Sequence, residues 1–164
     1  MNIYPIDETN RINRLDVVYL RRMFFVFVLL YAFFGIIDTV LYPNMWQTLI
    51  IIRFGIVIPF LILTMVLSYG KSFYKFYQIP VTFSFFIGGC GIAHMLILKP
   101  DNIIYYGGLF MVLFSGFLLI KLPLIPATIA GWMIVFYLLA GSLLFHGDIP
   151  SDIFYGTIFL WELM

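Results

Sequence analysis

Charge is the scarcest feature of this sequence of 164 residues. Charged residues make up 10% of the chain and the net charge is +1, whereas soluble domains carry about 25% charged residues. The balance gives no basic surface for nucleic acid, so we expect no nucleic-acid partner. Cysteine occurs once, as Cys90, which excludes an internal disulfide.

Motifs of enzyme chemistry are missing as well. The sequence contains no glycine-rich phosphate loop, no His-Glu-x-x-His, no Cys-x-x-Cys and no Gly-x-Ser-x-Gly. We therefore expect no catalytic residues, no cofactor and no enzymatic activity in this chain. A cleavable signal peptide is not expected either, because residues 1–22 are polar and basic and no small-residue cleavage site follows.

Long apolar runs are what the chain has in abundance. Hydrophobic residues make up 63% and aromatic residues 20%, and about 20 apolar residues in a helix span a bilayer. The runs predict an all-α integral membrane protein, an antiparallel bundle of six transmembrane helices of which the sixth is truncated. A cytoplasmic N-terminal segment, 1–22, precedes a transmembrane domain, 23–164. The expected helices cover residues 23–42, 48–69, 79–98, 103–120, 123–145 and 151–164.

The break at Lys121-Leu122-Pro123 is the shortest, and it admits an alternative. The two flanking runs could form one proline-kinked helix over 103–145. Such a helix would be about 65 Å long at about 1.5 Å per residue, twice the thickness of the hydrocarbon core. A tight turn between two helices is therefore favoured.

Lysine and arginine positions predict the orientation. Seven lie in the N-terminal segment and the second and fourth connections, and only Lys99 lies in the connections on the other side. Cytoplasmic loops carry the excess of these residues. We expect a multi-pass protein of the bacterial inner membrane with a cytoplasmic N-terminus and outer loops at 43–47, 99–102 and 146–151.

Two charges stand inside apolar runs. Asp38 is expected about 6 Å below the outer end of the first helix and Arg53 about 7 Å below the outer start of the second. Their matched depth across one hairpin predicts an ion pair, because an unpaired charge in a membrane is costly. The pair either locks the hairpin or lines an outward-facing ligand pocket in which it changes partners.

Other polar residues suggest weaker candidates. His94 is a further ligand or switch candidate, and with Cys90 one turn below it has the spacing of two metal ligands, although a hydrogen bond to a neighbouring helix explains it equally. Hard oxygen ligands in the outer loops suggest a cation site, with solvated loop acids as the alternative. This candidate outer site consists of Asp101, His146, Asp148 and Asp152.

Small residues recur at the spacing of close helix packing. Gly89 and Ala93 are four residues apart, as are Ala127 and Gly131. They predict a tightly packed bundle rather than a wide aqueous pore.

Several segments follow one another in a distinctive order between residues 21 and 132. They are Gly35-Ile36-Ile37-Asp38, Ile52-Arg53-Phe54 through Pro59, Gly89-Cys90-Gly91-Ile92-Ala93-His94-Met95, Tyr105-Tyr106-Gly107-Gly108-Leu109, Lys121-Leu122-Pro123 and Ala127-Thr128-Ile129-Ala130-Gly131-Trp132. In this order they resemble the six-helix membrane-associated sensor (MASE-type) domains at the N-terminus of bacterial nucleotide cyclases, especially class III adenylate cyclases.

The resemblance implies a signal-transduction role. It implies a receptor-like input domain that acts as a homodimer in the lipid bilayer, with an adenylate cyclase, or alternatively a diguanylate cyclase, as the output of a longer parent. The chain is then an isolated input domain or a truncated reading frame. The aromatic residues, the glycines of the third and fourth helices and the outer charged pair lead us to expect an apolar or amphiphilic ligand as its signal. A small membrane transporter or channel subunit is the alternative function.

Overall fold

The computed structural model describes residues 14–100, 103–118, 120 and 122–163, and these ranges contain helices and no strand. The elements are α1 (Arg14–Leu41), α2 (Trp46–Ile50), the π-helix η2 (Ile51–Val57), α3 (Ile58–Leu67), α4 (Phe73–Phe76), α5 (Gln78–Leu98), α6 (Ile103–Leu118), α7 (Leu124–His146) and α8 (Ser151–Leu163). The all-α class predicted from the sequence is confirmed. Because α2, η2 and α3 follow one another without a break, they act as one helix.

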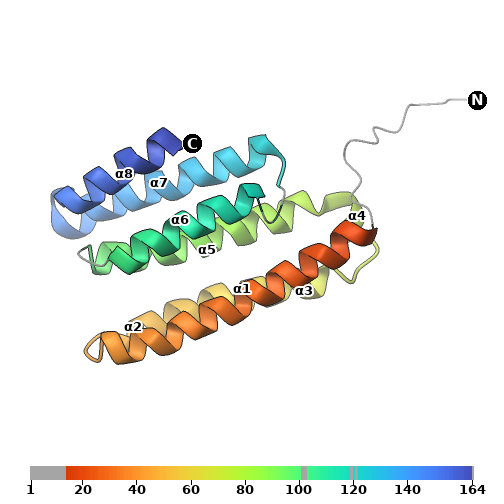
Figure 1. Ribbon diagram of the computed structural model, residues 1–164, viewed down its shortest axis with the longest axis horizontal. Helices are drawn as coiled ribbons and strands as arrows, with labels where there is room; N and C mark the ends of the chain where they lie inside the picture. Colours follow the sequence, from red (N-terminus) through yellow and green to blue (C-terminus); the bar gives the residue numbers. More distant parts are fainter. Residues whose placement is uncertain (1–13, 101–102, 119, 121, 164) are drawn as a thin grey trace, which may run out of the picture.

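Figure 1 shows the helices as three stacked pairs, with α1 beside α2–α3, α5 beside α6, and α7 beside α8. The central helix is α5, which packs against η2, α3, α6 and α7. Its sequence is rich in glycine and alanine in its second half, so neighbouring helices can come close to its backbone.

The contact between α5 and α7 depends on small residues. The four residues predicted to pack helices closely, Gly89, Ala93, Ala127 and Gly131, are all buried. At Gly89 a Cβ atom would overlap the side chain of Ile134 on α7. Only glycine therefore leaves room for Ile134 at this point.

The first helix begins earlier than the sequence predicted. Residues 14–22 were assigned to the N-terminal segment, but α1 already starts at Arg14. Its buried positions Val17, Leu20 and Phe24 follow one another at helical spacing and join the core. The basic residues in 14–22 made this segment look like part of the polar lead, but it is helical and packs through its apolar side.

Four helices in the described ranges are long and apolar enough to cross a membrane, and they cover Asp16–Leu41, Trp46–Leu67, Gln78–Leu98 and Leu124–His146. The helices α6 and α8 are shorter, with 16 and 13 residues. Large apolar side chains are exposed on the outside of the bundle, among them Phe33 and Phe136 at 58% and 73%. Such a surface suits lipid, since it would be unfavourable in water.

The chain does not continue as one helix from α6 into α7. The helix α6 ends at Leu118, and α7 begins at Leu124 directly after Pro123. Proline suits the start of a helix, because N–H groups there have no acceptor within the helix and the one that proline lacks is therefore no loss. α6 and α7 are therefore two separate helices rather than one kinked helix.

Candidate functional site

Asp38 and Arg53 form the ion pair predicted from their matched depth. Arg53 Nε donates to Asp38 Oδ2 at 2.7 Å, and the two side chains are 4% and 3% exposed. Asp38 lies one turn before the end of α1, and Arg53 lies in η2 on the returning helix. The two charges therefore meet across the first hairpin, close to its connecting loop.

The backbone around Arg53 is a π-helix of seven residues. The N–H of Ile58 donates to the carbonyl of Arg53, five residues back. Pro59 follows directly, and a proline ring has no N–H and crowds the carbonyl four residues before it. The wider π turn relieves this crowding, and such turns are frequent at functional sites.

Gly35 makes the close approach of η2 to α1 possible. A Cβ atom at this position would lie 2.5 Å from the ring of Phe54 and 3.4 Å from Arg53 Cδ. A larger residue would push the π-helix outward. Gly35 thus allows the stem of Arg53 to lie against α1 and reach Asp38.

A third residue completes the site, and sequence reasoning did not assign it. The hydroxyl of Tyr105 on α6 donates to Asp38 Oδ1 at 3.1 Å, and Tyr105 is 2% exposed. Its position in the sequence could have indicated this contact, because Tyr105 lies two residues after the start of α6, at a depth comparable with that of Asp38. The carboxylate therefore binds two partners from two helices.

Aromatic rings surround the guanidinium of Arg53. Its Cζ lies 5.6 Å from the ring centroid of Tyr31 and 5.9 Å from that of Phe34, within reach of cation–π attraction. The hydroxyl of Tyr31 in turn donates to the carbonyl of Gly88 on α5 at 2.5 Å. The site connects α1, η2, α5 and α6.

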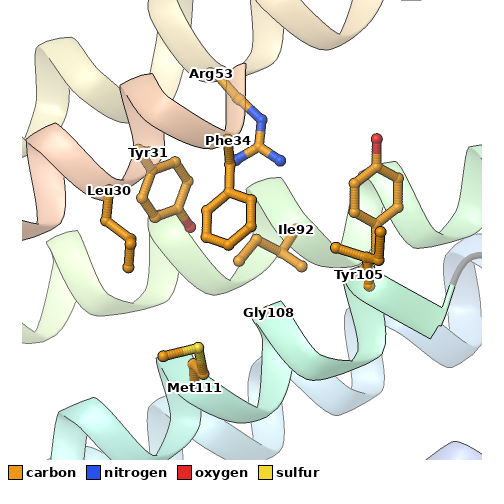
Figure 2. Close-up of a pocket in the computed structure, with 9 residues that line it drawn as sticks. Leu30, Tyr31, Phe34, Arg53, Ile92, Tyr105, Gly108 and Met111 are labelled. Carbon is orange, nitrogen blue, oxygen red and sulfur yellow. The ribbon is translucent and has the colours of Figure 1, made fainter. Parts of the chain in front are cut away.

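A small crevice lies beside this network, with a volume of about 40 Å³. Figure 2 shows the guanidinium of Arg53 reaching between the ring of Phe34 and Tyr105, with Gly108 and Met111 of α6 on the opposite wall. Its walls are formed by Leu30, Tyr31, Phe34, Arg53, Ile92, Ile104, Tyr105, Gly108 and Met111. Ile104 and Met111 are 44% and 57% exposed, so the crevice has a mouth at the side of the bundle.

His94 lies apart from this crevice. Its Nδ1 is 2.9 Å from the hydroxyl of Tyr137 on α7, and its ring packs edge-on against Phe145 at 5.9 Å between centroids. The structure thus joins Asp38 and Arg53 but does not place His94 among the residues that line their crevice. His94 instead connects α5 to α7, the helix contact that the sequence left open as an alternative to metal binding with Cys90.

The outer cation site remains a prediction. Asp101 lies outside the described residues, and Asp148 and Asp152 are exposed. His146 Nε2 lies 2.8 Å from the carbonyl of Ile97. Across the ranges that the structure describes, no three His, Cys, Asp or Glu side chains are grouped as metal ligands.

A second polar contact lies at the other end of the first hairpin. Arg21, which the sequence analysis treated only as a topology signal, donates through Nε to Ser68 Oγ at 2.8 Å and through Nη2 to the Ser68 carbonyl at 2.5 Å. Its Cζ lies 3.8 Å from the ring centroid of Tyr69. The two arginines therefore hold α1 to the returning helix at both ends.

The network thus combines a buried ion pair, a hydroxyl from a third helix and a lateral opening. This arrangement can bind a polar group and change partners. Comparison with family models, with curated proteins and with solved structures finds no match for this chain.

Proposed function

We propose that this chain is the membrane-embedded sensory input domain of a bacterial nucleotide cyclase, with an adenylate cyclase as the first candidate output and a diguanylate cyclase as the second. In this proposal six helices cross the inner membrane as an antiparallel bundle with a cytoplasmic N-terminus. Two copies act as a homodimer, and an apolar or amphiphilic molecule is the signal.

The observation that carries the proposal is the Asp38–Arg53–Tyr105 network. It joins the first helical pair to α6 beside a crevice that opens laterally. A ligand can act as a signal only if it binds one helix arrangement better than another. A hydrogen bond between two helix pairs at the edge of a binding crevice is a contact whose making or breaking distinguishes two arrangements.

The placement of buried charge favours a sensor over a transporter. Transporters carry polar residues on several facing helices near the bilayer midplane. Among the residues that the structure describes, Asp38 and Arg53 are the buried charged side chains, and both lie near one end of the first hairpin. The contact between α5 and α7 is formed mainly by small and apolar residues, with the His94–Tyr137 pair as a polar contact.

The energy required for such a signal is modest. Coupling between two sites is typically about 1–3 kcal/mol, or about 5–150-fold. One hydrogen bond to a charged group contributes about 1.5–3 kcal/mol. Release or strengthening of the Tyr105–Asp38 hydrogen bond is therefore a large enough change.

A fusion protein tests the proposal. The full chain is placed ahead of the catalytic domain of a class III adenylate cyclase, and cyclic AMP production is measured in membranes. We expect amphiphilic lipid extracts to change the output, and Tyr105→Phe to reduce the response. A fusion in which a single inert transmembrane helix replaces the chain is the control. An output that ignores both the extracts and Tyr105→Phe contradicts the proposal.

A further inference from the structure

Arg53 makes few of the hydrogen bonds it is able to make. A guanidinium has five N–H donors, and in the described part of the chain only Nε has an acceptor, Asp38 Oδ2. The other carboxylate oxygen accepts the Tyr105 hydroxyl. The terminal nitrogens Nη1 and Nη2 therefore carry four N–H groups into the crevice, on a side chain that is 4% exposed.

These donors require an acceptor. An unmade hydrogen bond is costly away from water, and more so in a membrane. In this crevice the side chains around the guanidinium are the apolar ones of Phe34 and Ile92, together with the hydroxyl of Tyr105, which donates elsewhere. A hydroxyl that donates can still accept, but the oxygens of Tyr31 and Tyr105 are not hydrogen-bonded to Nη1 or Nη2, so both nitrogens are open to an acceptor from outside the described residues.

The charge of the site decides which acceptor fits. Asp38 and Arg53 already neutralise each other, and no other described charged residue lines the crevice. An anionic head group would leave one net negative charge buried without a partner, which is strongly unfavourable. A neutral group with a carbonyl oxygen accepts the same hydrogen bonds and adds no charge.

The size and position of the crevice allow it to hold the head group of an amphiphile while the acyl chain stays outside the bundle. Its volume of about 40 Å³ is room for about three water-sized groups, which is comparable with an ester or amide. Leu30 and Phe34 on α1 and Ile104 and Met111 on α6 line the crevice, and it opens where Ile104 and Met111 are exposed. An acyl chain can leave there directly into the bilayer without entering the bundle.

We propose that the crevice between α1 and α6 binds the uncharged ester or amide carbonyl of a long-chain amphiphile, held by the terminal nitrogens of Arg53. This inference rests on the proposed function, because it names the chemistry of the signal. It separates neutral amphiphiles, which bind, from fatty acids and long-chain amines, which do not.

Two neighbouring glycines of α6 provide a matched pair of variants. A Cβ at Gly108 lies 3.6 Å from Ile92 Cδ1, on the crevice wall, whereas a Cβ at Gly107 meets no described heavy atom within 4 Å. We expect Gly108→Leu to fill the crevice from the α6 side without replacing Arg53 or Asp38. Gly107→Leu makes the same change of helix propensity outside it.

The experiment uses the full chain in lipid nanodiscs with methyl oleate that is ¹³C-labelled at the ester carbonyl. Isotope-edited infrared spectroscopy reports whether this carbonyl accepts a strong hydrogen bond, and unlabelled oleate, oleylamine and hexadecane serve as competitors. We expect a saturable, red-shifted carbonyl band in the wild type and in Gly107→Leu, and its loss in Gly108→Leu. Oleate and oleylamine should compete at least about tenfold more weakly than unlabelled methyl oleate, and hexadecane should not compete.

Two outcomes overturn the inference. Competition by oleate equal to that of the ester refutes the charge argument, and the absence of any shifted band shows that Arg53 does not bind the ester carbonyl. Since Gly108→Leu carries a bulky residue, Gly108→Ala, whose Cβ fits without overlap, serves as the second variant and should retain the band with a weaker affinity. The cyclase fusion is read separately, so a response to lipid extracts without a shifted band rejects this site while leaving the sensory function standing.

Discussion

Asp38 and Arg53 are each unfavourable alone in an apolar bundle and are stable only together. Removing one partner of a buried pair typically costs about 3–5 kcal/mol, because the other charge stays buried. We expect Asp38→Asn and Arg53→Gln each to lower the free energy of unfolding by about that amount. The double variant should cost less than the sum, since it leaves no unpaired charge. Unfolding in mixed micelles measures this cycle, and additive effects would contradict a direct pair.

Tyr105 contributes through its hydroxyl to Asp38. Tyr105→Phe keeps the ring and removes that donor, so we expect a loss of about 1.5–3 kcal/mol, as for a hydrogen bond to a charged group. Tyr155→Phe on α8 is the control, because Tyr155 is 69% exposed and its change should stay within about 0.5 kcal/mol. Equal effects of the two substitutions in the same unfolding assay would refute the bond.

The two parts of this site differ in how far sequence alone could predict them. A charge inside an apolar run must find a partner, so matched depth was enough to pair Asp38 with Arg53. Tyrosine is common near membrane interfaces because its ring is amphipathic. The presence of Tyr105 there therefore did not require a specific partner. The packing of α6 against α5 and the first hairpin was needed to bring its hydroxyl to Asp38.

At the scale of the elements, the start of α1 and the π-helix η2 are the two features that the sequence did not predict. The sequence analysis placed the start of the first helix at the first long apolar residues, but α1 extends to Arg14 because Val17 and Leu20 pack into the core. The π-helix was not predicted either. A single extra residue in a turn does not disturb an apolar run that has no polar face, so periodicity cannot detect it.

The contact of α5 with α7 allows a direct test. Gly89→Leu should destabilise the bundle by about 1–3 kcal/mol, as expected for overpacking, because the new side chain overlaps Ile134. Adding Ile134→Ala should recover part of the loss. Gly107→Leu, where the added side chain starts in open space, is the control. Thermal unfolding of the wild type, the two single variants and the double variant measures these differences. If Gly89→Leu leaves the stability unchanged, the two helices do not pack as described.

At the scale of the whole molecule, orientation is the first expectation to test. With Cys90→Ala as background, Asn44→Cys should react with a membrane-impermeant maleimide only from outside the cell, and Lys71→Cys only from the cytoplasmic side. Both positions are exposed, and the lysine and arginine bias places them on opposite sides. Labelling of Asn44→Cys from the cytoplasm alone would reverse the topology.

The account as a whole requires that the crevice between α1 and α6 changes when its ligand binds. Spin labels at Val40→Cys and Gly107→Cys, both at exposed positions, in the Cys90→Ala background report the distance between these helices by double electron–electron resonance. We predict that methyl oleate in nanodiscs shifts the distance distribution, and that adding Gly108→Leu abolishes the shift. An identical distribution with and without the ester, while its carbonyl band shows it bound, would contradict the account.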